Sequence, residues 1–79
     1  MNSLYFELIN GDLIFELSSN HDITSPVEQF LAGDGTEIEY ALLGYFSGIG
    51  LNPSIEIEKV KQSIIRQMKS GATSFTIFL

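Results

Sequence analysis

The sequence predicts a small α+β domain, and three observations lead to this fold class. Residues 4–17 alternate apolar and polar side chains on both sides of an Asn10-Gly11 pair, as in a β-hairpin. Pro residues follow Ser25 and Asn52, a position typical of the first turn of a helix. The chain ends on an alternating apolar segment, residues 74–79. With 79 residues and no Cys, we expect a single domain over residues 1–79 without disulfides.

The hairpin turn is expected to be of type I′, because Asn and Gly tolerate the positive φ that both central positions need. This turn places Ile9 opposite Asp12 and fixes the register as far as Leu4 opposite Leu17. One face then holds only apolar residues: Leu4, Phe6, Leu8, Leu13, Phe15 and Leu17. The other face holds Tyr5, Glu7, Ile9, Asp12, Ile14 and Glu16. A slip of one residue would exchange the faces, so turn and pattern support the same register.

The first helix is expected after a polar connection over residues 18–25. Ser25 is the expected N-cap, Pro26 lies in the first turn, and Glu28 completes a capping box. The helix is short and ends at Gly33. Its core-facing residues are Val27, Phe30 and Leu31.

The next segment, residues 37–46, has two interpretations. A capping-box pattern at Thr36–Glu39 and the helical spacing of apolar residues predict a second helix. The residues at this spacing are Ile38, Ala41, Leu42, Tyr45 and Ile49. A strand is the alternative, since residues 37–42 also alternate polar and apolar positions and Gly44 disfavours a helix.

The third and longest helix is expected to begin at Asn52-Pro53 and to end at Gly71. Its apolar stripe consists of Ile57, Val60, Ile64 and Met68. Acidic residues near its start and basic residues near its end agree with the helix dipole. The closing strand, residues 74–79, then places Phe75, Ile77 and Leu79 on one side. The right-handed preference of crossover connections favours this strand beside the first one, in a three-stranded sheet of order 2-1-3 packed on the helices.

The charges are unevenly distributed along the chain. The net charge is −6, and all ten acidic residues precede the first basic residue, Lys59. The four bases are Lys59, Lys61, Arg66 and Lys69. Such a chain is not expected to bind nucleic acid directly, because binding to phosphates requires Lys and Arg. No membrane span is expected either, since the longest uncharged stretch, residues 40–55, is short and contains Gly and Pro.

Residue clusters that resemble catalytic or metal sites have simpler explanations. His21 with its neighbouring Ser, Asn and Asp residues is typical of a turn rather than of a catalytic triad. Neither residues 34–37 nor residues 20–22 have the spacing of a calcium or zinc site. Residues 44–50 are rich in Gly but lack the Lys of a phosphate-binding loop. Glu7 and Glu16 lie on a flat strand surface, which lacks the cleft of a glycosidase. We therefore expect neither an enzyme nor a cofactor or metal site.

The mixed face of the hairpin is the most informative surface, because apolar side chains among carboxylates are typical of an interface. The alternative explanation for its apolar residues is that the second helix or a disordered segment packs over this face. The expected function is non-enzymatic binding of a basic protein partner, at a site that could itself hold nucleic acid. The expected contact residues are Tyr5, Glu7, Ile9, Asp12, Ile14, Glu16, Glu37, Glu39 and Tyr40.

In bulk properties alone, the chain resembles small bacterial or phage antagonists. Its size, acidity, lack of Cys and lack of catalytic residues are similar to those of anti-CRISPR, DNA-mimic and immunity proteins. The resemblance implies an inhibitor that occupies a basic site. A homo-oligomeric structural protein is the alternative, pairing through the same face or the edge of the last strand. No secretory signal is recognised in the first residues, so a cytoplasmic location is expected.

Overall fold

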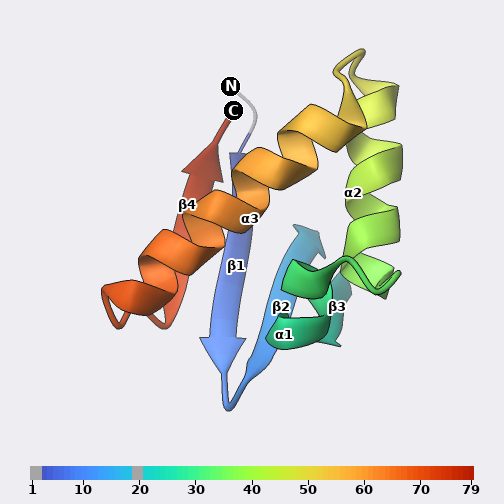
Figure 1. The fold of residues 1–79 in the computed structure, drawn as a ribbon. Coiled ribbons are helices and arrows are strands. Elements are labelled where there is room, and N and C mark those ends of the chain that lie inside the picture. Colours follow the sequence, from blue (N-terminus) through green and yellow to red (C-terminus); the bar gives the residue numbers. More distant parts are fainter. Residues whose placement is uncertain (1–2, 19–20) are drawn as a thin grey trace.

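Strands β1 (Ser3–Ile9), β2 (Asp12–Ser18) and β3 (His21–Pro26) form an antiparallel meander at the start of the chain. Helices α1 (Val27–Ala32), α2 (Glu37–Gly48) and α3 (Pro53–Lys69) follow, and β4 (Ser74–Phe78) closes the fold. These elements are seen in a computed structural model that describes residues 3–18 and 21–79 (Figure 1). The α+β fold class predicted from the sequence is therefore confirmed.

The predicted hairpin is confirmed in turn and in register. Asn10 and Gly11 have φ values of 52° and 83°, as a type I′ turn requires. The pairs between β1 and β2 run from Tyr5 opposite Glu16 to Ile9 opposite Asp12. The turn is also hydrogen-bonded to the start of α1, because the Val27 N–H donates to the Gly11 carbonyl at 2.9 Å.

The polar connection predicted over residues 18–25 is wrong, because most of this segment is strand β3; residues 19 and 20 lie outside the described residues. Ser25 is not an N-cap: it pairs with Leu13 in the sheet and is only 4% exposed. The N-cap of α1 is Pro26, with no side-chain capping hydrogen bond, so the expected capping box is also absent from α1. The predicted end is correct, since Gly33 adopts the left-handed conformation.

The sheet has four strands in the order β3-β2-β1-β4, one more than the sequence predicts. The last strand lies beside the first, as expected, but the pairing is antiparallel, with Tyr5 opposite Thr76. The handedness rule for crossovers concerns parallel strands, so it is not the reason for this order. Phe75 instead joins the row of aromatic rings in the core, with its centroid 5.7 Å from that of Phe6.

Helix α2 confirms the helical interpretation of residues 37–46, and the strand alternative is wrong. Its N-cap is Thr36, whose Oγ1 accepts from the Glu39 N–H at 3.3 Å. Helix α3 begins as predicted, with the Asn52 Oδ1 accepting from the Ser54 N–H at 3.1 Å and Pro53 in the first turn. Both caps satisfy backbone donors that have no partner within the helix.

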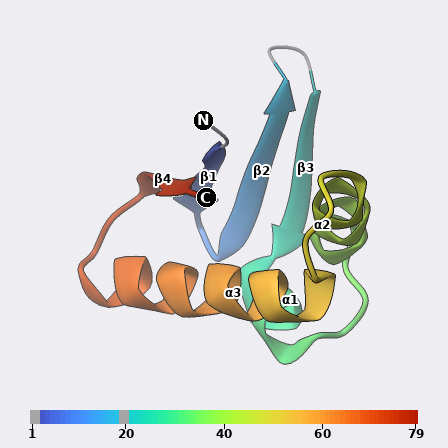
Figure 2. The same ribbon diagram turned by 90° about the horizontal axis from the view of Figure 1, so that it is seen from above.

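The core lies between the helices and the apolar face of the sheet. Its buried apolar residues are Leu4, Phe6, Leu13, Phe15, Val27, Phe30, Ile38, Leu42, Phe46, Ile57, Val60, Ile64 and Phe75. Leu17, Ile49 and Met68 were expected there but are exposed. Leu17 lies at a bulge near the end of β2 that extends beyond the helices (Figure 2). Ile49 lies just beyond the last residue of α2, and Phe46 rather than Ile49 is the buried residue at this end of the helix. Met68 lies in the last turn of α3.

All three helices lie on one side of the sheet, with α2 beside β3 at its edge (Figure 2). The opposite face of the sheet carries none of the helices formed by residues 3–18 and 21–79. No helix in these ranges has both the length and the apolar character needed to cross a bilayer. None of the described helices therefore covers this face of the sheet.

Candidate functional site

The open side of the sheet forms a surface that we call the acidic face. Side chains alternate between the two sides of a strand, so every second residue of β1 and β2 points away from the helices. On these two strands the acidic face consists of Tyr5, Glu7, Ile9, Asp12, Ile14 and Glu16. The outer strands extend it with Asp22 and Thr24 of β3 and with Ser74, Thr76 and Phe78 of β4.

The strand register brings the carboxylates of this face close together across three strands. Asp22 lies directly opposite Glu16, whereas Glu7 lies diagonally between Glu16 and Asp12. Opposed Cβ atoms in an antiparallel pair lie about 5 Å apart and diagonal neighbours roughly 7–8 Å apart. Four negative charges therefore follow one zigzag path from β3 to the turn end of the hairpin.

No cation compensates this charge within the described ranges, residues 3–18 and 21–79. The ion pairs found there join Lys59 to Glu56 at 3.4 Å and Lys61 to Glu39 at 3.8 Å, away from the acidic face. Like charges directly opposite each other on a sheet are destabilising. The Glu16–Asp22 pair is therefore an unfavourable arrangement for the fold itself.

Exposed apolar side chains lie among these carboxylates. Ile9 is 46% exposed, Phe78 is 70% exposed and Tyr5 is 36% exposed, while Ile14 is partly buried. Aromatic and aliphatic side chains surrounded by polar groups are typical of protein interfaces. The alternative explanation, a helix that covers this face, is not found among residues 3–18 and 21–79, because α1, α2 and α3 all pack on the other side of the sheet.

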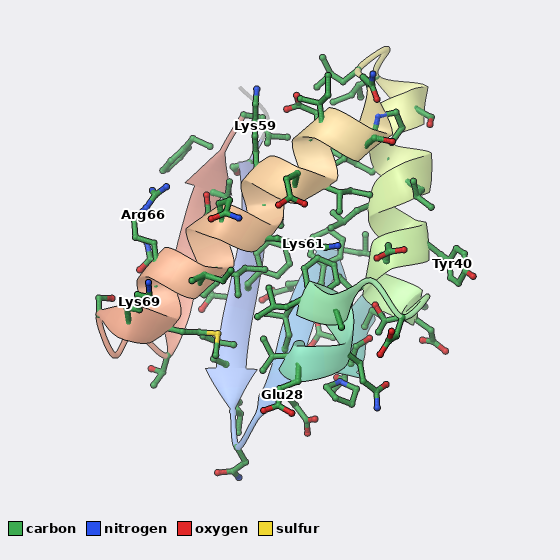
Figure 3. All side chains as sticks on the ribbon, viewed as in Figure 1. Glu28, Tyr40, Lys59, Lys61, Arg66 and Lys69 are labelled. Atoms are coloured by element: carbon green, nitrogen blue, oxygen red, sulfur yellow. The ribbon has the colours of Figure 1, made fainter. Side chains whose placement is uncertain are left out.

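The structure does not bring the three predicted residues of α2 to this face. Glu37, Glu39 and Tyr40 belong to the first turns of α2, in the helix layer. Glu39 points toward α3, where it meets Lys61 and is only 20% exposed. Tyr40 projects from α2 away from α3 (Figure 3). The predicted site residues thus divide into six that share the acidic face and three that lie elsewhere.

Asp22, Thr24, Ser74 and Thr76 belong to the acidic face but were not among the predicted site residues. Asp22 and Thr24 were missed because residues 18–25 were interpreted as a connection. The alternation of Ile23 and Ser25, which point inward, with Asp22 and Thr24 could have indicated a strand. The closing strand was predicted, but its polar residues Ser74 and Thr76 were not assigned to the site.

The His and carboxylate side chains of the sheet lie in exposed or partly exposed positions. His21 is exposed at the start of β3, and no group of three or more His, Asp or Glu side chains that could hold a metal occurs among residues 3–18 and 21–79. The carboxylates of the acidic face lie on an open strand surface rather than in an enclosed cleft. A groove of about 810 Å³ does exist, but it is lined by α3 and the end of β4 and by no carboxylate of the acidic face.

Comparisons with protein-family models, with curated proteins and with solved structures found no match in any of the three. The acidic face and the groove therefore have to be interpreted from their own geometry and chemistry.

Proposed function

We propose that this protein is a binding module whose acidic face occupies a basic site on a partner protein, and so blocks that site. One observation carries the proposal: four carboxylates cross an open sheet face among exposed apolar side chains, and no cation among residues 3–18 and 21–79 pairs with them. Solubility alone would be served equally well by scattered charges. Their concentration on one face creates a local negative potential, which steers a positively charged partner.

The two kinds of side chain would have different roles in such a complex. The carboxylates Glu7, Asp12, Glu16 and Asp22 would accelerate association and select a basic surface. Tyr5, Ile9 and Ile14 would supply the apolar contacts that slow dissociation, because buried aromatic and aliphatic anchors dominate binding energy. The like-charge contact between Glu16 and Asp22 would be relieved when cations of the partner lie against it.

The spacing of the carboxylates supports a partner site that normally holds a nucleic-acid backbone. Positions two apart along a strand are separated by roughly 6–7 Å, similar to successive phosphates of one nucleic-acid strand. The path from Asp12 through Glu7 to Glu16 extends over two strands at comparable intervals. In a groove that binds phosphates through Lys and Arg, these carboxylates would therefore lie at about the spacing of the phosphates that they replace.

The test is a capture experiment with matched charge reversals. The wild-type protein, a Glu7→Lys/Glu16→Lys variant and a Glu28→Lys/Asp34→Lys variant are immobilised and exposed to the same bacterial lysate at low salt. Glu28 and Asp34 lie in α1 and just after it, in the helix layer, so the control changes the net charge equally without touching the acidic face.

We expect one set of proteins to be retained by the wild type and by the control, lost from the Glu7→Lys/Glu16→Lys variant, and released by high salt. Added duplex DNA should compete for the same proteins if their site binds nucleic acid. Equal retention on all three baits would contradict the proposal, because charge on the acidic face would then be irrelevant. Circular dichroism of each variant confirms that the fold is retained.

A further inference from the structure

β4 is an edge strand without the usual protection against pairing. It lies at one end of the sheet, and residues 74–79 include neither a charged residue nor Pro. Exposed edges are usually blocked by charges, Pro or a covering element. The other edge has all of these features, since β3 contains Asp22 and Pro26 and packs against α2. The contrast indicates that the β4 edge is adapted to receive another strand.

The hydrogen-bond pattern shows which backbone groups of β4 point outward. The Leu8 N–H donates to the Thr73 carbonyl at 2.8 Å, which makes Leu8 and Thr73 a hydrogen-bonded pair. Such pairs alternate with non-bonded pairs along an antiparallel ladder. Phe75 and Ile77 therefore direct their backbone groups to β1. Ser74, Thr76 and Phe78 direct theirs to the open edge.

An apolar groove lies next to this edge. It has a volume of about 810 Å³ and an apolar lining of Ile55, Val60, Ile77, Phe78 and Leu79. Helix α3 crosses β4 obliquely, so that the start of α3 and the end of β4 diverge (Figure 1). The C-terminal end of α3 extends past the β4 edge in both views (Figures 1 and 2).

The side of α3 that lines the groove is complementary to itself. Glu58, Gln62 and Arg66 follow one another at intervals of four residues and all line the groove, so they form one stripe along the helix. In an antiparallel pair of such helices, Glu58 of each copy lies opposite Arg66 of the other, with Gln62 at the centre. Lys59 and Arg66 project on this side of α3, whereas Lys61 points toward α1 and α2 (Figure 3).

We propose that two copies of this chain form a symmetric dimer through β4 and α3. The two β4 strands pair antiparallel, with Thr76 opposite Thr76 and Ser74 opposite Phe78, so that the outward backbone groups of both copies are satisfied. The two-fold axis is perpendicular to the sheet, which makes the α3 helices antiparallel. The end of each α3 that extends past the edge then lies over the groove of the other copy.

A second copy fits this site better than an unrelated extended peptide. A peptide could pair with the edge, but it would not meet Glu58 and Arg66 with a matched set of opposite charges. The basic residues of the chain all lie in α3, so this is also the region where two chains of net charge −6 repel each other least. The dimer does not depend on the proposed function, although it would place both acidic faces on the same side of one eight-stranded sheet.

The test measures the dimer dissociation constant by sedimentation velocity over a dilution series, for the wild type and for variants with altered charges on α3. We expect the wild type to dissociate from dimer to monomer on dilution. Arg66→Glu should raise the dissociation constant by roughly tenfold or more, because both Glu58–Arg66 contacts become repulsive. A Glu58→Arg/Arg66→Glu variant should restore the dimer, since the exchange recreates both pairs.

A second variant tests the strand pairing. Thr76→Pro removes a backbone donor that points outward and leaves the bonds from Phe75 and Ile77 to β1 intact, so monomer folding should persist and dimerisation should be lost. Thr24→Pro, on the opposite edge, is the matched control. A wild type that stays monomeric at the highest concentrations would overturn the proposal and leave the edge to a different protein. A dimer unaffected by Arg66→Glu and Thr76→Pro would also overturn it.

Discussion

Replacing Glu16 should stabilise the fold, because this residue lies directly opposite Asp22 on the open side of the sheet. The Cβ atoms of such opposed residues lie about 5 Å apart, and two unit charges at that same separation in water repel by about 0.8 kcal/mol. Screening at moderate ionic strength reduces the repulsion to about 0.5 kcal/mol. Glu16→Gln should therefore raise the free energy of unfolding by about 0.5 kcal/mol, and Glu16→Lys by about 1 kcal/mol, since repulsion becomes attraction.

Urea denaturation measures this effect without changing the ionic strength. With an m-value of about 1 kcal/mol per molar urea, the Glu16→Lys midpoint should rise by roughly 1 M. In about 1 M NaCl, where the screening length falls to about 3 Å, most of the gain should disappear. Asp34→Lys makes the same change in net charge without a carboxylate opposite, and should stay within about 0.5 kcal/mol of the wild type.

A double-mutant cycle isolates the pair itself. In the Glu16→Gln background, Asp22→Asn should add little stability, although Asp22→Asn alone should stabilise the wild type. The reasoning would be refuted if Glu16→Lys were no more stable than the wild type at low salt, or if its gain persisted unchanged at high salt. Either result would mean that Glu16 and Asp22 do not face each other as the register requires.

Three further substitutions test the elements that position the acidic face. Phe15→Ala should lower the free energy of unfolding by about 3–5 kcal/mol, because the ring is buried and stacks on Phe6 with centroids 5.0 Å apart; a thermal midpoint like that of the wild type would contradict this core. Thr36→Ala should cost about 1 kcal/mol by removing the acceptor of the Glu39 N–H, as measured by urea denaturation, whereas Thr36→Ser should retain most of the stability. Asn10→Ala should cost roughly 1–2 kcal/mol because φ is 52° at this position, while Asn10→Gly should be tolerated, and equal denaturation midpoints for the two variants would exclude the type I′ turn.

The parts of the fold that are predictable from the sequence are those in which a local signal and the hydrophobic pattern agree. Asn10-Gly11 selects a turn whose register puts all apolar side chains of the hairpin on one face, and each feature alone would be weaker. Asn52-Pro53 likewise marks a helix start that the following apolar stripe supports. The six hairpin residues of the acidic face follow directly from that register.

Strand β3 shows where sequence reasoning fails. Its residues are mostly polar, because an edge strand with one open face needs few apolar side chains. Ser25 followed by Pro26 imitates a helix cap, yet the sheet uses the backbone of Ser25 for pairing with Leu13. The acidic charge pair of Glu16 with Asp22 could not be predicted without this strand, since only the tertiary pairing brings the two side chains together.

The site residues predicted on α2 show a second limit. Glu37, Glu39 and Tyr40 share the acidity and aromatic character of the hairpin face, but composition does not specify which layer a side chain occupies. Helix α2 packs on the core side of the sheet, and Glu39 there meets Lys61. The groove between α3 and β4 also escapes sequence analysis, because it depends on the angle at which the helix crosses the strand.

The most direct test of the acidic face is the rate at which a captured partner associates with it. Stopped-flow or biosensor measurements would compare the wild type with Glu7→Lys/Glu16→Lys and with Glu28→Lys/Asp34→Lys over a range of salt concentrations. We expect the wild-type association rate to fall steeply with salt, and the acidic-face variant to associate roughly tenfold or more slowly at low salt, with the control close to the wild type. Equal rates for both variants would contradict the assignment of this face as the binding surface.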